Sequence, residues 1–138
     1  MGAAALSLER RGALITGGSR GIGKETALSF ARAGADIVIA DIVPEIDSAA
    51  AEVLALGRRA LAVHVDVTSS DQVHEAVARA VRELGKVDIL VNSAGIHLSQ
   101  RFTEGTVQNW ERILRVNLLG TIICCRAVID GMIERQYG

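Results

Sequence analysis

The sequence has no marked excess of charge of either sign. Its 138 residues include 15 Lys and Arg against 16 Asp and Glu. Nucleic acids and anionic membranes bind surfaces with a strong positive field, so we expect neither as a partner. Residues 1–7 lack the regions of a signal peptide, and Leu6 stands where a myristoylation motif needs a hydroxyl. We therefore expect a cytoplasmic protein.

Cysteine and histidine are also scarce. The only cysteines, Cys124 and Cys125, are adjacent, which suits neither an unstrained disulfide nor a zinc site. The three histidines, His64, His74 and His97, do not have the spacing of metal ligands. We expect no metal site and a reduced compartment, with the cysteines acting as small core residues.

What the sequence does contain is a regular alternation of strands and helices. Four apolar runs are predicted to be buried strands: Gly12–Thr16, Asp36–Asp41, Ala60–Val67 and Val87–Val91. A helical period follows each strand, and the last helix is long. This pattern predicts an α/β fold with a parallel sheet covered by helices on both faces. We expect a Rossmann-type sheet in the order 3-2-1-4.

Several helix ends are marked in the sequence. Gly34, Gly57 and Gly85 each follow a periodic segment, and we interpret them as helix stops. The second helix is expected to open at Pro44. Its predicted inward stripe is Ile46, Ala50, Val53 and Leu54.

Ligands of open parallel sheets bind beyond the carboxyl ends of the strands. Four features of the sequence fall at such ends: the glycine-rich turn Thr16–Gly23, the acids Asp41 and Asp66, and the segment Asn92–Gly95. Their convergence predicts one binding crevice.

The glycine-rich turn, TGGSRGIG, fits two phosphate-binding patterns. As a nucleoside-triphosphate loop, Gly18 to Lys24 is a near match, but Glu25 stands where a Ser or Thr must hold magnesium. As a dinucleotide turn, the strand, the turn, the helix and an acid about 20 residues later all agree. We favour the dinucleotide interpretation.

The turn resembles the cofactor turn of the short-chain dehydrogenase/reductase family. The sequence is also similar to that family in Asp66–Val67, in NSAG, where Ser93 replaces the usual second asparagine, and in RVNLLG around Asn117. The resemblance implies a nicotinamide cofactor whose pyrophosphate lies over the turn and the start of the next helix. It implies a catalytic role for Asn117, and cofactor contacts for Gly17, Ser19, Arg20, Gly21, Ile22, Gly23, Asp41, Asp66, Val67, Asn92, Ala94 and Gly95.

Asp41 sets the expected choice of cofactor. Its carboxylate would accept the adenosine ribose hydroxyls and repel a 2′-phosphate, so we expect NAD rather than NADP. Arg20 favours NADP, but Ile42 offers no second cation.

The family's chemistry also needs a serine, a tyrosine and a lysine four residues after the tyrosine. The only tyrosine is Tyr137, followed by Gly138, and the only lysines are Lys24 and Lys86. The resemblance therefore covers the N-terminal cofactor-binding half of a family member. We expect residues 1–138 to form one dinucleotide-binding domain, incomplete at its C-terminus after the long helix and inactive alone.

Two functions remain open. The chain is either the front part of an NAD(P)-dependent oxidoreductase for an alcohol or carbonyl substrate, or a stand-alone nucleotide-binding or interaction module on the same fold. In both cases the fourth strand would be an open edge, and the last helix carries apolar residues on more than one flank. We expect a homo-oligomer formed through that helix or that edge.

Overall fold

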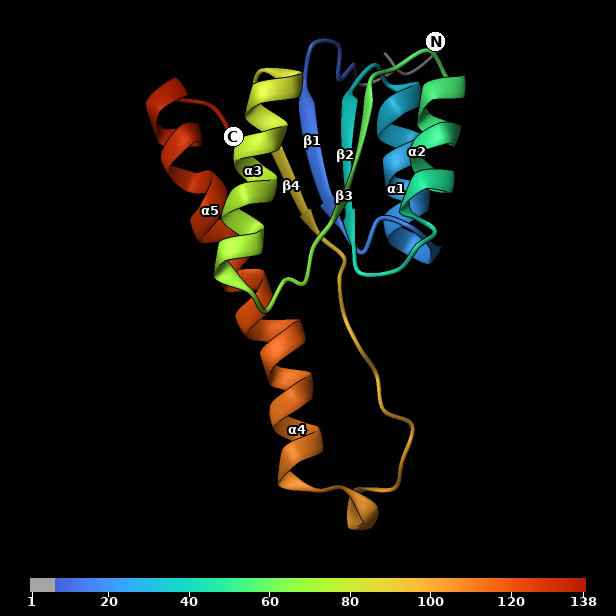
Figure 1. The fold of residues 1–138 in the computed structure, drawn as a ribbon, viewed down its shortest axis with the longest axis vertical. Helices are drawn as coiled ribbons and strands as arrows, with labels where there is room; N and C mark the ends of the chain where they lie inside the picture. Colours follow the sequence, from blue (N-terminus) through green and yellow to red (C-terminus); the bar gives the residue numbers. More distant parts are fainter. Residues whose placement is uncertain (1–6) are drawn as a thin grey trace, which may run out of the picture.

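The computed structural model describes residues 7–138, so residues 1–6, including Leu6, lie outside the described part (Figure 1). Its centre is a parallel sheet of four strands in the order β3-β2-β1-β4, which confirms the predicted fold class and strand order. The strands are β1 (Gly12–Thr16), β2 (Asp36–Asp41), β3 (Ala60–His64) and β4 (Ile89–Asn92).

Two helices cover each face of the sheet (Figure 1). On one face lie α1 (Gly21–Arg32) and α2 (Ile46–Ala55), and on the other lie α3 (Ser70–Leu84) and α5 (Gly120–Arg135). Successive strand residues point to opposite faces, so Ile15 packs in the core under α1 and α2 while Leu14 packs in the core under α3 and α5.

The helix ends follow the predicted signals. Gly34, Gly57 and Gly85 all have positive φ, at 105°, 79° and 94°, which confirms them as the residues where helices stop. At the start of α3, the Ser69 hydroxyl accepts a hydrogen bond from the Gln72 backbone N–H at 3.4 Å.

Four local predictions were wrong. The second helix begins at Ile46 and not at Pro44, which lies in the turn before it, and the fourth strand runs Ile89–Asn92 and not Val87–Val91. The third strand ends at His64 rather than Val67, because its partner β2 ends at Asp41, opposite His64, and offers no further backbone groups. Leu54 is 55% exposed, and Ala49 takes its place in the buried stripe of α2. The stripe starts at Ile46, and Leu54, eight residues later, falls at its margin.

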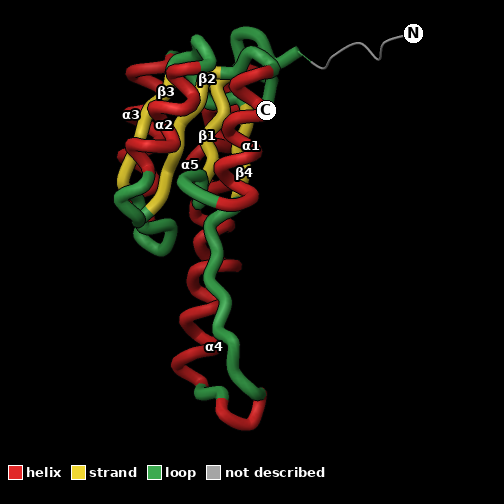
Figure 2. The backbone as a smooth tube through the Cα atoms, turned by 90° about the vertical axis from the view of Figure 1, so that its right-hand side faces the viewer, coloured by secondary structure: helices red, strands yellow, loops and turns green. Residues whose placement is uncertain are grey.

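The last helix is longer than the sheet and runs beyond it. It consists of α4 (Val107–Leu114), a π-helical turn η2 (Arg115–Leu119) and α5. Figures 1 and 2 show α4 and the loop before it projecting from the body as an arm, on the side of the carboxyl ends of the strands. In the 3₁₀ turn η1 (Phe102–Glu104), the Phe102 ring stacks on Trp110 with 5.3 Å between centroids.

This helix, Val107–Arg135, is the one helix within residues 7–138 that is long and apolar enough to cross a membrane. Core helices of soluble proteins meet the same criterion of length and composition, so it assigns no membrane role by itself.

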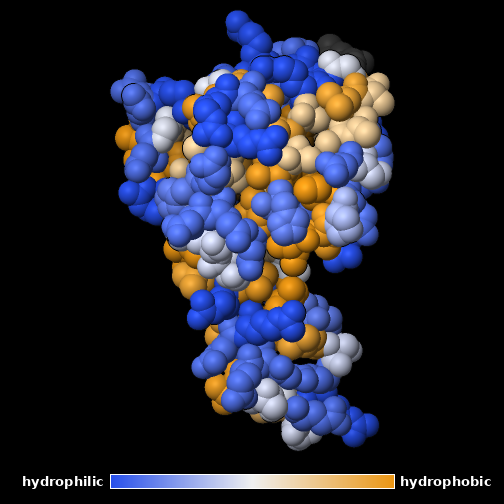
Figure 3. Space-filling model, in the orientation of Figure 1, coloured by the Kyte–Doolittle hydropathy of each residue, from blue (hydrophilic) through white to orange (hydrophobic). Residues whose placement is uncertain are grey.

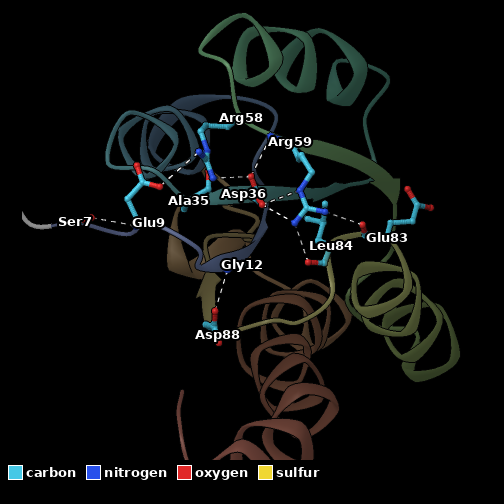
Figure 4. Close-up of polar contacts among 10 residues, drawn as sticks. All are labelled: Ser7, Glu9, Gly12, Ala35, Asp36, Arg58, Arg59, Glu83, Leu84 and Asp88. Carbon is cyan, nitrogen blue, oxygen red and sulfur yellow. Dashed lines mark hydrogen bonds and ion pairs between the residues drawn. The ribbon is translucent and has the colours of Figure 1, made fainter.

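The opposite end of the sheet is held by buried carboxylates (Figure 4). Asp36 accepts hydrogen bonds from Arg58 Nη2 at 3.1 Å and from Arg59 Nε at 2.9 Å, and Arg59 also donates to the carbonyl of Leu84 at the end of α3. Burial alone would raise the pKa of Asp36, but the hydrogen bonds and charge of Arg59, aided by Arg58, outweigh it and hold that pKa below its usual range. Asp88, 2% exposed, accepts from the Gly12 N–H and pairs with Lys86.

Candidate functional site

The carboxyl ends of the strands surround a cavity of about 490 Å³. Its walls come from the glycine-rich turn, the ends of β2 and β3, the loop after β4, and the continuous helix Val107–Arg135, called the arm helix below. Of the residues predicted to bind a cofactor, eight line this cavity: Gly17, Arg20, Ile22, Asp41, Asp66, Val67, Ala94 and Gly95. The structure thus brings together four segments that are far apart in the sequence.

Three of the four glycines of the turn, Gly17, Gly21 and Gly23, are needed for different reasons. Gly17 has a φ of +63°, and a Cβ there would lie 2.7 Å from the Ala94 nitrogen. A Cβ on Gly23 would overlap the Gly17 carbonyl. Gly21 has a φ of +55°, a backbone conformation that other residues rarely adopt, and no other part of the chain lies within 4 Å of its Cβ position, so glycine is needed there for conformation and not for space.

Thr16 joins the turn to the opposite wall of the cavity. It is 1% exposed, and its hydroxyl accepts hydrogen bonds from the backbone N–H groups of Ser93 and Ala94, both at 3.2 Å. Sequence reasoning did not include Thr16 among the site residues. Its position as the last buried residue before the glycines was the signal that could have identified it.

Asp41 is held at the mouth of the turn by two backbone donors. The Ser19 N–H donates to Oδ2 at 3.2 Å and the Ile42 N–H donates to Oδ1 at 2.8 Å. The Ser19 hydroxyl is buried without a hydrogen-bond partner among residues 7–138. A buried hydroxyl without a partner costs free energy, and because Ser19 does not line the cavity, this atom is not placed to meet a ligand there.

The loop after β3 is fixed in a similar way. Asp66 Oδ1 accepts from the backbone N–H and the hydroxyl of Thr68, at 2.9 and 2.7 Å. Val67 packs against Gly120 so closely that a Cβ on Gly120 would lie 2.7 Å from Val67 Cγ2. The wall formed by Asp66 and Val67 is therefore rigidly joined to the start of α5.

Asn117 lies in the middle of η2 and binds the loop after β4. Its Oδ1 accepts from the Ile96 N–H at 2.8 Å, and its Nδ2 donates to the Ile96 carbonyl at 3.0 Å. Asn117 does not itself line the cavity. Asn117 acts on the site by positioning the loop after β4, whose residues Ala94, Gly95 and Ile96 line the cavity.

Asn92 differs from the other predicted residues. Its side-chain Nδ2 donates to Cys125 Sγ at 3.5 Å, and it lines a second cavity of about 450 Å³ between β4 and α5. The structure therefore does not bring its side chain to the first cavity, because it points to the α5 side of β4. Ser19, Gly21 and Gly23 shape the turn without lining the cavity.

Comparison with known proteins agrees with this geometry. The profile of the short chain dehydrogenase family matches residues 11–138. The chain is 34% identical over 128 residues to a 3-oxoacyl-[acyl-carrier-protein] reductase of Synechocystis, covering 91% of this chain and 52% of that protein. It is 37% identical to the (2S)-[(R)-hydroxy(phenyl)methyl]succinyl-CoA dehydrogenase subunit BbsD of Thauera aromatica, covering 96% and 54%. The chain thus spans about half the length of these curated relatives.

Solved structures show the same similarity. A short-chain type dehydrogenase/reductase from Mycobacterium marinum superposes with a TM-score of 0.90 at 34% identity, over 95% of this chain and 53% of that chain. A short chain dehydrogenase from Mycobacterium paratuberculosis bound to NAD gives a TM-score of 0.89 at 30% identity, over 93% and 52%. This chain belongs to the short-chain dehydrogenase family, whose members are NAD(P)-dependent.

Proposed function

We propose that this chain is the NAD-binding part of an oxidoreductase that transfers a hydride between a nicotinamide cofactor and an alcohol or carbonyl substrate. The observation that carries the proposal is the cavity at the strand ends, with its glycine turn on one side and the carboxylate of Asp41 on the other. The family membership and the NAD in a similar solved structure support it.

The residues present fit a dinucleotide. The N-terminus of α1 adjoins the part of the cavity wall formed by Gly17, Arg20 and Ile22, and it suits a pyrophosphate because helix N-termini favour anions. The Asp41 carboxylate suits ribose hydroxyls, and the wall of Asp66 and Val67 suits the adenine. When bound, NAD supplies the hydride acceptor or donor.

We propose NAD rather than NADP as the preferred cofactor. A 2′-phosphate about 4 Å from the Asp41 carboxylate would cost on the order of 4 kcal/mol at an effective dielectric constant near 20. Arg20 lines the same cavity and reduces this cost. Calorimetric titration of the chain with both dinucleotides tests the proposal, and tighter binding of NADP would contradict it.

We propose that a polypeptide of these 138 residues binds NAD without turnover. The two lysines are engaged away from the cavity: Lys24 pairs with Glu52 at 2.6 Å and Lys86 with Asp88 at 3.0 Å. The Arg11 guanidinium lies 3.8 Å from the centroid of the Tyr137 ring. No tyrosine–lysine pair is therefore available to move the substrate's proton. Saturable reduction of NAD by the purified chain with an alcohol, lost on N117A, would contradict this and would support the catalytic role of Asn117.

We also propose that the chain self-associates. Apolar side chains gather where the arm meets the body (Figure 3), and the exposed ones on the arm helix include Leu114, Leu118, Leu119, Ile122, Ile129 and Ile133. An exposed apolar surface of this kind beside the free edge of β4 favours pairing. Light scattering at micromolar concentration tests it: a monomeric mass would contradict the proposal, and L118E should lower the mass of the assembly. The expected cytoplasmic location, without membrane or nucleic-acid partners, stays a prediction.

A further inference from the structure

Two arginines of the arm helix line the cavity at the strand ends but are not among the residues predicted to bind a cofactor. Arg112 lies in α4 and Arg115 opens η2. Both side chains line the same cavity as Asp41, Asp66 and Thr68. Both residues are exposed, and neither side chain makes a hydrogen bond or ion pair with another residue in 7–138.

The packing of the helix locates these arginines at one end of the cavity. Gly120 packs on Val67, and Val116, one turn earlier, also lines the cavity. Arg112 lies one further turn toward the tip of the arm, and Arg115 is adjacent to Val116. Both arginines therefore belong to the helical wall of the cavity, which also contains the loop Asp66–Thr68, where the proposed function places the adenine; both also border a separate hollow beside Leu118 and Ile122.

At this end of the cavity, an arginine side chain is better suited than a lysine to contact an aromatic ring of a ligand. The cavity-lining residues from the loop after β3 and from the helix include the apolar Val65, Val67 and Val116, together with Thr68 and with Asp66, whose Oδ1 is already bonded to Thr68. Arginine has a planar, weakly hydrated side chain that stacks on aromatic rings, whereas lysine carries a compact charge and cannot stack in this way.

We propose that Arg112 and Arg115 bind the adenine of the cofactor by stacking their guanidinium planes against the base. The inference rests on the proposed function, because it assumes that the adenine half of a dinucleotide occupies this end of the cavity. The arm helix then takes part in binding the cofactor, in addition to the strand ends.

The test measures binding of AMP, which contains the adenine but no nicotinamide. Calorimetric titration of the full chain with AMP should show affinity about tenfold weaker for the double variant R112A/R115A than for the original chain. The double variant R112K/R115K, which keeps both charges, should lose most of the same affinity. R126A is the matched control, because Arg126 is an exposed arginine of the same long helix that pairs with Asp130 and does not line the cavity.

Two results of the AMP titration would overturn the proposal. AMP affinity of R112A/R115A within twofold of the original chain would overturn it, and so would full affinity in R112K/R115K, which would show that charge alone is needed. Circular dichroism melting of each variant identifies a loss that comes from unfolding, and a folded variant with weakened AMP binding supports the proposal. If the original chain binds neither AMP nor NAD, the proposed function itself fails, which distinguishes that failure from this one.

Discussion

The side-chain amide of Asn117 makes two hydrogen bonds to the backbone of a single residue, Ile96. The Ile96 N–H donates to Oδ1 at 2.8 Å and the Ile96 carbonyl accepts from Nδ2 at 3.0 Å. This pair joins the π-helical turn η2 to the loop after β4. The wall formed by Ala94 and Gly95 is therefore held in place by the arm helix.

Substitution N117A should lower the free energy of unfolding by about 1–2 kcal/mol, because two hydrogen bonds are lost and the Ile96 backbone is left with water as its only partner. Urea unfolding followed by circular dichroism measures the change. T121A is the control: its hydroxyl bonds only to the Asn117 carbonyl within the same helix. A loss no greater than that of T121A would contradict the positioning role of Asn117.

Substitution G17A should be much more harmful than G57A. Both glycines have positive φ, at +63° and +79°, so both substitutions incur about 1–2 kcal/mol of backbone strain. Only at Gly17 would the added Cβ also collide with Ala94, whereas no atom lies within 4 Å of the Cβ position at Gly57. Thermal melting should show the larger decrease for G17A, and NAD titration should show lost binding in G17A alone. Equal effects of the two substitutions would contradict the described turn.

Stability should fall in acid partly because of Asp36. Its folded pKa is below the ordinary value of 3.8, so the ionised carboxylate stabilises the fold above that pH and loses this effect as the pH falls through the folded pKa. D36N should therefore be less stable near neutral pH and show a smaller decrease in stability below about pH 4. Urea unfolding between pH 3 and 7 measures both. An unchanged acid dependence in D36N would show that other carboxylates are responsible.

One thiol should react in the folded chain. Cys124 is 2% exposed, and burial, with a smaller effect of Cys125, raises the pKa of its thiol to about 11, so it is protonated at pH 8. Cys125 is exposed. A thiol reagent at pH 8 should label one cysteine quickly and both after unfolding, and C125S should remove the fast reaction. Two fast thiols in the native chain would mean that α5 is not packed as described.

The sequence was sufficient to predict the sheet order and the crevice, because apolar strands, glycine stops and the turn chemistry are local signals with known geometry. It did not predict the hydrogen bonds of Thr16 or the place of Arg112 and Arg115 in the cavity wall, because each depends on a segment that is distant in the chain. Asp88 was missed for the same reason: although Lys86 is close in the sequence, the bond from the Gly12 N–H forms only after β1 and β4 have paired.

The π-helical turn at Arg115–Leu119 was likewise outside the predictions. Residue periodicity over 107–135 favours one regular helix, and the local widening coincides with the bonds of Asn117 to Ile96, which are tertiary contacts.

The most direct test of the account is to observe where NAD binds. Two-dimensional ¹H–¹⁵N NMR of the labelled chain, titrated with NAD, should show saturable shifts at the amides of Gly17–Gly23, Ile42, Val67–Thr68 and Ala94–Ile96, with little change along β4 and α5. Saturable shifts confined to the second cavity, between β4 and α5, or no shifts at millimolar NAD, would contradict the assignment of this chain as an NAD-binding domain.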